Sequence, residues 1–177
     1  MAFFGEGSKF GVNIRYVKEE QALGTVGGLT LIRDEIDDAF LLINGDTLTT
    51  LNFSDLVSYH RRNRATATLA LKKRLINIDF GVVEVDSRSK KVKGYVEKLT
   101  LVNWVSMGVN VLSPGALDYI EPNKYLDFPN LIQKLISNGE KVKGFMFDGY
   151  WLDIGRPEDY ERANMEIEEI YSKLGIS

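Results

Sequence analysis

The chain is a succession of short apolar runs whose spacing changes between that of strands and that of helices. Ala39–Ile43 is apolar throughout, which is typical of a strand buried on both faces in a parallel sheet. Val12–Val17 alternates apolar and polar residues, so we expect a half-buried strand there. Further strands are predicted over Ala65–Lys72, Val105–Leu112 and Val142–Phe147.

Segments with helical spacing separate these strands. Phe53–Arg64 is amphipathic, and Asn52 or Ser54 can cap its start. Gly24–Ile36 has the same apolar spacing and is expected to be helical. Prolines near capping residues predict two further helix starts, at Ser113-Pro114 and Asp127-Phe128-Pro129, and Arg156-Pro157 is expected to open a long final helix. Gly139 and Gly175 are expected to end the last two of these helices.

A β-hairpin is predicted where Gly81–Val85 and Val92–Glu97 flank the polar run Asp86-Ser87-Arg88-Ser89. Strands and helices alternate through most of the chain, as expected for a sheet covered by helices. The sequence contains no internal repeat, low-complexity tract or linker. We therefore expect a single α/β domain over residues 1–177.

Composition narrows the class of protein. The 177 residues include 22 Lys and Arg against 25 Asp and Glu, a net charge of -3 that argues against a nucleic-acid partner. The absence of cysteine excludes disulfides, thiolate metal sites and a cysteine nucleophile. No apolar run is long enough to cross a bilayer and no signal peptide opens the sequence, so we expect a cytoplasmic protein without a membrane partner.

Asp46 and Asp153 are the main candidates for chemistry. Asp46 follows the apolar strand Ala39–Ile43, and ligands of open α/β sheets bind at the carboxyl ends of strands. If the fold brings Asp153 to it, two carboxylates about 4 Å apart would repel by roughly 4 kcal/mol at an effective dielectric of about 20. A divalent cation such as Mg²⁺ removes this repulsion. The alternative is that both are turn residues that cap local backbone.

Three other features have both a chemical and an ordinary interpretation. Glu19 stands five positions before Gly24 at a predicted helix entrance and could bind a base edge, or the segment could be a loop and a cap. Glu97-Lys98 could bind a hydroxyl and a phosphate oxygen, or be surface charges. His60 falls on a predicted exposed helix face, so we expect it to be solvated.

In this order, the segments resemble the sugar-1-phosphate nucleotidyltransferases (NDP-sugar pyrophosphorylases). The resemblance implies a Rossmann-like mixed sheet flanked by helices and a reaction of a nucleoside triphosphate (NTP) with a sugar 1-phosphate that yields an NDP-sugar and pyrophosphate. It rests on six stretches that together cover most of the chain, namely Phe4–Val12, Ala22–Thr25, Leu42–Asp46, Phe80–Glu84, Val96–Lys98, and Gly149–Gly155 with Pro157–Tyr160.

The same resemblance implies roles for individual residues. Asp46 and Asp153 match the Mg²⁺ ligands, and Lys98 matches a catalytic cation that faces the sugar phosphate. A carboxylate at the base-reading position, Glu19, suits the N1–H and N2–H₂ donors of guanine and favours GTP. The nucleotide-binding positions also include Gly24, Thr25 and Gly45, and the sugar-binding positions are Gly81, Glu97 and Ser106.

The sequence departs from the family pattern in three places. No stretch matches the glycine-rich loop G-x-G-T-R-L-x-P-x-T that wraps the triphosphate; Leu99 replaces the proline that commonly follows Glu-Lys, and Ser106 replaces an asparagine. The strands that carry this loop would lie between Val12–Val17 and Ala39–Ile43, whose edges would otherwise be unpaired. We expect an N-terminally truncated domain; the alternatives are a sheet that closes differently or a homo-oligomer that shares the exposed edge.

These observations leave three hypotheses. The first is an incomplete nucleotidyltransferase with negligible activity on its own, because the Arg and Lys of the triphosphate loop are missing. The second is a non-catalytic nucleotide-sugar-binding paralogue or regulatory subunit. The third is a metal-dependent glycosyltransferase, which the Trp151–Gly155 pattern disfavours.

Overall fold

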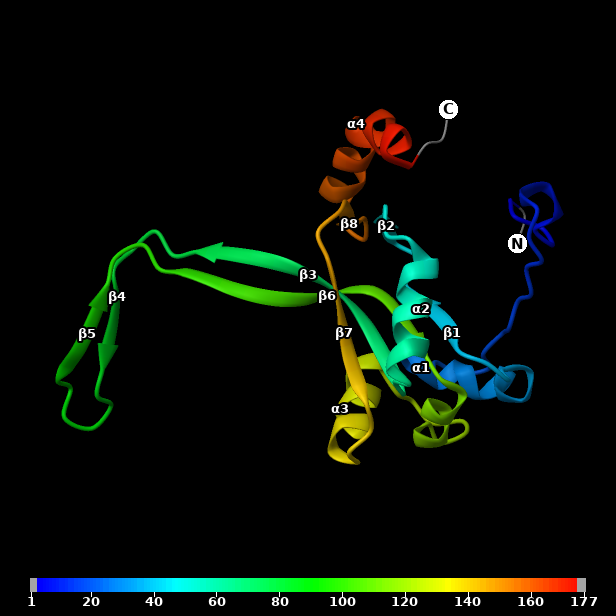
Figure 1. The fold of residues 1–177 in the computed structure, drawn as a ribbon, viewed down its shortest axis with the longest axis horizontal. Coiled ribbons are helices and arrows are strands. Elements are labelled where there is room, and N and C mark those ends of the chain that lie inside the picture. Colours follow the sequence, from blue (N-terminus) through cyan, green and yellow to red (C-terminus); the bar gives the residue numbers. More distant parts are fainter. Residues whose placement is uncertain (1–2, 175–177) are drawn as a thin grey trace.

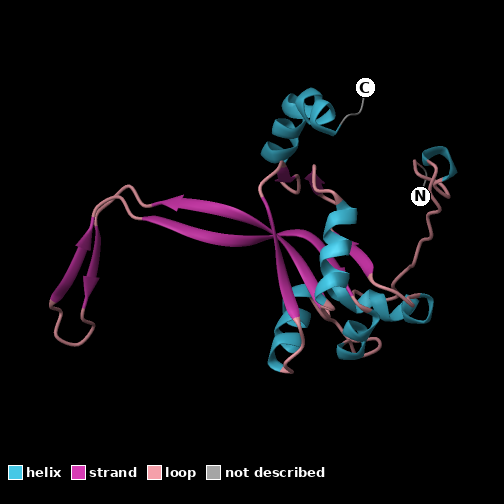
Figure 2. Ribbon diagram, in the orientation of Figure 1, coloured by secondary structure: helices cyan, strands magenta, loops and turns pink. Residues whose placement is uncertain are grey.

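The computed structural model describes residues 3–174 and contains a central mixed sheet with helices on both faces (Figures 1 and 2). Its strand order is β1-β6-β3-β7, in which β3 pairs antiparallel with β6 and parallel with β7. The strands are β1 (Phe40–Ile43), β3 (Ala67–Asn77), β6 (Thr100–Leu112) and β7 (Val142–Phe147). The predicted α/β class with a mixed sheet is confirmed.

Alternating side chains of β6 divide the core into two layers. Val109 and Val111 point to the face covered by α2 (Phe53–Asn63), where they pack in one buried cluster with Leu56. Leu112 faces the other side, in a cluster with Leu131 of α3 (Phe128–Ser137). Each of these leucines is fully buried, which stabilises the fold by roughly 1.5–3 kcal/mol per side chain.

Most predicted helices form where the sequence placed them. The Asn52 side chain caps α2 by accepting hydrogen bonds from Ser54 N at 2.9 Å and Asp55 N at 3.4 Å. The helix expected over Gly24–Ile36 is instead one α-helical turn, α1 (Gly24–Gly27), followed by a 3₁₀ segment. Glycine has a low helix propensity, and the glycines at 27 and 28 stand where the α-helix ends. The other helices are η1 (Ser8–Phe10), η2 (Gly28–Glu35), η3 (Pro114–Tyr119) and α4 (Pro157–Leu174); the expected end of α4 at Gly175 lies outside the described residues.

One predicted strand does not form, and another forms with a different pairing from the one expected. Val12–Val17 forms no strand. Val12 and Val17 are 54% and 50% exposed, because no strand among residues 3–174 lies beside the alternating segment to pair with it. Ala39–Ile43 does form a strand, but β1 is half-buried and pairs antiparallel with β6 only, rather than lying inside a parallel sheet. In residues 3–174 the outer edge of β1 has no strand partner, and association through it stays a prediction. None of the helices described is long and apolar enough to span a bilayer.

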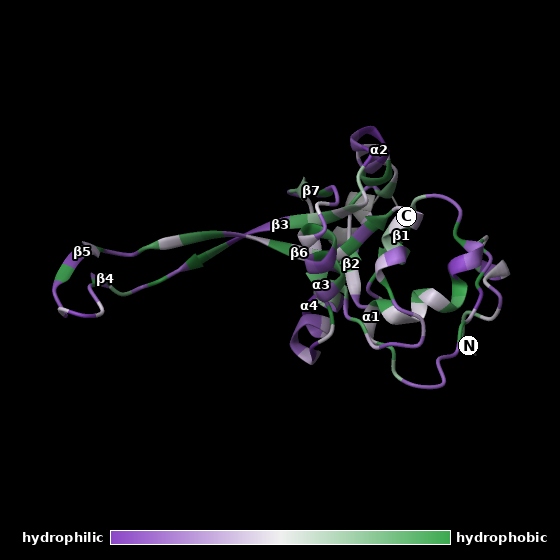
Figure 3. Ribbon diagram, turned by 90° about the horizontal axis from the view of Figure 1, so that it is seen from below, coloured by the Kyte–Doolittle hydropathy of each residue, from purple (hydrophilic) through white to green (hydrophobic). Residues whose placement is uncertain are grey.

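A long ribbon extends away from the core (Figure 1). β3 and β6 continue to pair as far as Asn77 opposite Thr100, and the chain between them forms the predicted hairpin of β4 (Val82–Val85) and β5 (Val92–Val96). Hydrophobic segments run along this ribbon outside the core (Figure 3). Leu75 at 60% exposure is an example.

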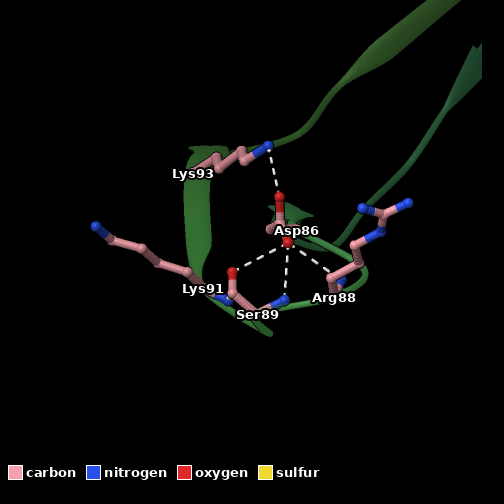
Figure 4. Close-up of polar contacts among 5 residues, drawn as sticks. All are labelled: Asp86, Arg88, Ser89, Lys91 and Lys93. Carbon is pink, nitrogen blue, oxygen red and sulfur yellow. Dashed lines mark hydrogen bonds and ion pairs between the residues drawn. The ribbon is translucent and has the colours of Figure 1, made fainter.

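Asp86 organises the turn of the hairpin (Figure 4). Its Oδ1 accepts hydrogen bonds from Ser89 N at 2.8 Å and Arg88 N at 3.1 Å, and Lys93 Nζ lies 3.0 Å from Oδ2. The Ser89 N–H first, and Lys93 next, lower the pKa of the Asp86 carboxyl to about 2. The ionised form of Asp86 therefore holds the turn.

The turn should respond to acid in a defined window. Since the folded pKa of Asp86 is about 2 and the ordinary value is 3.8, its contribution is complete above pH 3.8 and is lost as the pH falls through about 2. NMR titration should show the amide protons of Arg88 and Ser89 shifting with a midpoint near pH 2. Asp86→Asn should remove this shift, and a midpoint close to 3.8 in the original chain would contradict the assignment.

His60 is buried rather than solvated, which corrects the sequence-based expectation. It is 2% exposed; its Nδ1 lies 2.9 Å from Thr68 Oγ1 and its Nε2 lies 2.9 Å from Ser113 Oγ. Since the Ser113 hydroxyl donates to Ala65 O at 2.8 Å, Nε2–H must donate to Ser113 and Nδ1 must accept from Thr68. Burial first, and Arg61 second, lower the pKa of His60.

This histidine should make the fold sensitive to mild acid. In the unfolded chain His60 binds a proton near pH 6.5, whereas in the folded chain it binds one only at a lower pH. The contribution of His60 to the free energy of unfolding is therefore fully present above pH 6.5. It falls between pH 6.5 and the lower folded pKa, by at most about 1.4 kcal/mol per pH unit. Urea unfolding at pH 7.5, 6.5 and 5.5 measures this. His60 is the only histidine in the sequence, so stability that stayed constant over this range would contradict the prediction.

Candidate active site: a carboxylate pair beside a cavity

Asp46 and Asp153 are brought together by a short antiparallel pair of strands. β2 (Thr47–Thr49) pairs with β8 (Trp151–Asp153) so that Thr47 lies opposite Asp153. Ile154 N donates a hydrogen bond to Asp46 O at 2.9 Å. Backbone pairing thus joins two acidic residues that are more than 100 positions apart in the sequence.

Gly155 shows how close the two carboxylates are. A Cβ atom at Gly155 would lie 3.1 Å from Asp46 Oδ2 and 3.1 Å from Asp153 Oδ1, so these oxygens are at most twice that distance apart. Gly155 N donates to Asp153 Oδ1 at 3.0 Å and fixes that carboxylate. Both aspartates are exposed. The glycine leaves open a space that faces both acids.

This arrangement fits a magnesium ion. Mg²⁺ prefers oxygen ligands and usually keeps several waters beside one or two carboxylates and substrate phosphates. Within residues 3–174, no third acidic side chain joins the pair and no Lys or Arg forms an ion pair with either acid. The carboxylates are therefore free to bind a cation, and its remaining ligand positions are open to water or phosphate oxygens.

A cavity of about 430 Å³ opens beside Asp153. Thr25 and Ser106, two other residues singled out in the sequence, also line it. Its remaining lining residues come from β6, from the start of α3 and from neighbouring segments, and are Asn44, Leu69, Met107, Gly108, Asn110, Phe128, Pro129, Ile132, Gln133 and Trp151. The cavity therefore combines an apolar wall with polar groups and an acidic rim.

The carbonyl of Met107 ties the cavity wall to the carboxylate pair. It accepts a hydrogen bond from Trp151 Nε1 at 2.9 Å and another from Thr47 Oγ1 at 3.3 Å. Trp151 belongs to β8 and Thr47 to β2, so both strands of the pair are anchored to β6. The position of Asp153 relative to the cavity is fixed by these bonds.

Thr25 connects α1 to the start of α3. Its hydroxyl accepts a hydrogen bond from Phe128 N at 2.7 Å, and its own N–H donates to Asp127 Oδ1 at 3.1 Å. The Tyr125 hydroxyl first, and the Thr25 N–H next, lower the pKa of the Asp127 carboxyl. Thr25 thus has a structural role in addition to its place on the cavity rim.

Gly24 begins α1, and Glu19 lies in the loop that precedes it. Gly24 has φ +77, and a Cβ atom there would lie 2.6 Å from Leu126 O. Glu19 Oε2 accepts a hydrogen bond from Leu23 N at 3.0 Å, and Glu19 is not among the residues that line the cavity. Glu19 thus holds the loop that precedes α1, but the N-cap residue, Leu23, makes no side-chain hydrogen bond, so the expected cap does not form there; base recognition by Glu19 stays a prediction. Gly45 lies beside Asp46 with open space around it.

Three predicted site residues lie far from the carboxylate pair. Gly81, Glu97 and Lys98 are on the outer part of the ribbon, near β4 and β5 (Figure 1). There Glu97 Oε2 accepts a hydrogen bond from the Tyr95 hydroxyl at 2.9 Å, and a Cβ atom at Gly81 would collide with Tyr95. The structure groups these residues with one another but does not bring them to Asp46 and Asp153.

Sequence analysis missed two residues, one beside the carboxylate pair and one in the cavity. Gly155 was noted only as part of a pattern, although its missing side chain leaves the shared space open. Asn110 was passed over as part of a strand, although it is 2% exposed and lines the cavity. A polar residue between Val109 and Val111 in an otherwise apolar run is the signal that could have identified it.

The mixed sheet with helices on both faces defines an α/β domain, and comparison with known proteins identifies its family. The family model for Nucleotidyl transferase matches residues 2–170, so the chain belongs to that family. The resemblance seen in the sequence is thereby confirmed.

Two relatives illustrate the similarity. The chain is 31% identical over 171 residues to the mannose-1-phosphate guanylyltransferase of Mycobacterium tuberculosis, covering 94% of this chain and 47% of the relative. It is 32% identical over 162 residues to the mannose-1-phosphate guanyltransferase of Schizosaccharomyces pombe, covering 86% and 43%. The chain thus spans less than half the length of these relatives.

Solved structures share the fold. A candidate glucose-1-phosphate thymidylyltransferase from Bacillus anthracis superposes with a TM-score of 0.69 at 22% identity, covering 93% of this chain and 69% of that one. HddC from Yersinia pseudotuberculosis superposes with a TM-score of 0.63 at 23% identity, covering 88% and 67%.

Proposed function

We propose that this chain serves the formation of a nucleotide-sugar and pyrophosphate from a nucleoside triphosphate and a sugar 1-phosphate, with GTP and mannose 1-phosphate as the substrates. The observation that carries the proposal is the pair of carboxylates, Asp46 and Asp153, on either side of the space left by Gly155. The names of the two relatives support guanine and mannose.

In this proposal Asp46 and Asp153 hold Mg²⁺, which when bound supplies charge neutralisation for the phosphates. A phosphate oxygen of the sugar 1-phosphate attacks the α-phosphorus of the nucleotide in line, and the bond to pyrophosphate breaks. The chain acts by positioning and neutralising charge, and no side chain becomes a covalent nucleophile.

The remaining predicted residues have defined places in the proposal. Gly24, Thr25 and Gly45 face the nucleotide, with Glu19 accepting from guanine; Ser106 faces the sugar in the cavity. Lys98, Glu97 and Gly81 would act only if the ribbon bends toward the carboxylates. The proposed location of the protein is the cytoplasm.

We also propose that the chain alone releases little pyrophosphate, because no stretch of it matches the glycine-rich triphosphate loop. The distance of Lys98 from the carboxylate pair supports a second candidate function, a nucleotide-sugar-binding module without turnover. Both candidates require the same Mg²⁺ site and the same cavity.

Isothermal calorimetry with GDP-mannose, in Mg²⁺ and in EDTA, tests the shared part of these proposals. Binding that needs Mg²⁺ supports the site, and a pyrophosphate-release assay with GTP and mannose 1-phosphate then separates enzyme from binding module. UDP-glucose and dTDP-glucose test the choice of base and sugar. Absence of Mg²⁺-dependent binding by any of the three nucleotide-sugars would contradict both candidate functions.

A further inference from the structure

Asn110 is a buried polar residue in the centre of the sheet. It is 2% exposed, and Val109 and Val111 beside it are fully buried. Its Oδ1 is the one buried side-chain polar atom that lacks a hydrogen-bond partner in the part of the chain the structure describes. Buried amide oxygens are nearly always hydrogen-bonded, so this one calls for an explanation.

The position of Asn110 explains why the protein itself supplies no partner. In the sheet Asn110 lies between Leu42 of β1 and Leu69 of β3. It lines the cavity beside Asp153, where Leu69 and Ile132 form apolar parts of the wall. Neither leucine nor isoleucine can donate a hydrogen bond to the amide oxygen.

Stability alone does not account for an asparagine at this position. An unpaired buried amide destabilises the folded state, whereas an apolar side chain of similar size would pack against Leu69 without that cost. A group that costs stability and faces a cavity is the arrangement expected when a ligand supplies the missing partner.

We propose that the Asn110 amide binds a hydroxyl group of the sugar ring of the nucleotide-sugar, and so helps to determine which sugar is accepted. This inference rests on the proposed function of the same site. A hydroxyl can donate to Oδ1 and also accept from the amide NH₂, whereas a phosphate cannot donate to Oδ1 and would be repelled by its partial negative charge. Asp153 lies on the rim of the same cavity, which places the phosphates there and the sugar further in.

The test compares GDP-mannose with GDP, both in Mg²⁺, on the original chain and on Asn110→Leu. The affinity for GDP-mannose should fall about tenfold while the affinity for GDP changes less than twofold, since only the former carries the sugar. The melting temperature of the free protein should rise, because the unpaired amide is gone. Asn110→Ala is the second variant, in case leucine packs poorly at this position. It should lose the same affinity for GDP-mannose, but its melting temperature should not rise.

Gln133→Leu is the matched control. It removes an amide from the same cavity, but Gln133 is exposed and water can bind its amide when no ligand is present, so the melting temperature should not rise. Unchanged affinity for GDP-mannose in both Asn110 variants would overturn the inference and leave the proposed function standing. Equal losses for GDP and GDP-mannose would also overturn it. If the original chain bound neither ligand, the proposed function would fail, and the inference with it.

Discussion

Replacing Asp153 with asparagine will weaken the Mg²⁺-dependent binding of GDP-mannose by about 100-fold, since loss of an outer-shell partner alone costs metal sites roughly tenfold to 100-fold. The substitution keeps the shape of the side chain, and an amide oxygen can still accept the hydrogen bond from Gly155 N. Only the charge toward the cation changes. Asp46→Asn should have an effect of similar size, because the two carboxylates face the same space.

The measurement is calorimetric titration of GDP-mannose over a series of Mg²⁺ concentrations. Asp79→Asn removes a carboxylate from the outer ribbon and should change nothing. Gly155→Ala tests the space itself: its Cβ atom would lie 3.1 Å from an oxygen of each acid, whereas a Cβ atom at Gly115 meets nothing within 4 Å. Gly155→Ala should therefore weaken Mg²⁺-dependent binding and Gly115→Ala should not. Equal behaviour of Asp153→Asn and Asp79→Asn would exclude a metal site at this pair.

Local sequence patterns were sufficient to predict the elements whose stabilising contacts are local. The helix α2 needs only its apolar face and the Asn52 cap, and the β4–β5 hairpin needs only its turn around Asp86. Val12–Val17 has an equally clear alternation, but no strand in the described part of the chain pairs with it. Period-two alternation predicts a pleated segment, and it does not predict whether another strand pairs with it.

The same limit explains the wrong prediction for His60. Its position on α2 was predicted, but its hydrogen-bond partners are Thr68 on β3 and Ser113 at the end of β6. These hydroxyl groups lie 8 and 53 positions further along the sequence, so the sequence of the helix itself does not predict them. Contacts of this kind are fixed by tertiary packing.

The candidate site could be predicted where the resemblance to the family assigned a role to a residue. Asp46 and Asp153 were singled out from a pattern, and the structure does bring them together. The sequence could not show that Gly81, Glu97 and Lys98 would lie on a ribbon outside the core, because the length of β3 and β6 beyond the last core residue depends on how the two strands pair.

Replacing Gly24 with alanine will destabilise the fold by about 3 kcal/mol, of which roughly 1–2 kcal/mol is backbone strain. Gly24 has φ +77, a conformation that alanine rarely adopts. The Cβ atom would also lie 2.6 Å from Leu126 O and 2.9 Å from Asp127 Oδ1. The second contact would displace the carboxylate that accepts from Thr25 N, so the link between α1 and α3 would loosen.

Gly139→Ala separates the strain from the collision, because Gly139 has φ +76 and nothing lies within 4 Å of the added Cβ atom. It should cost about 1 kcal/mol, a drop in melting temperature of roughly 2–4 °C in a domain of this size, whereas Gly24→Ala should lower it by about 10 °C. If both variants lost the same amount, the collision would contribute nothing. If Gly24→Ala then still abolished binding of GDP, Gly24 would be required for the nucleotide rather than for packing against Leu126.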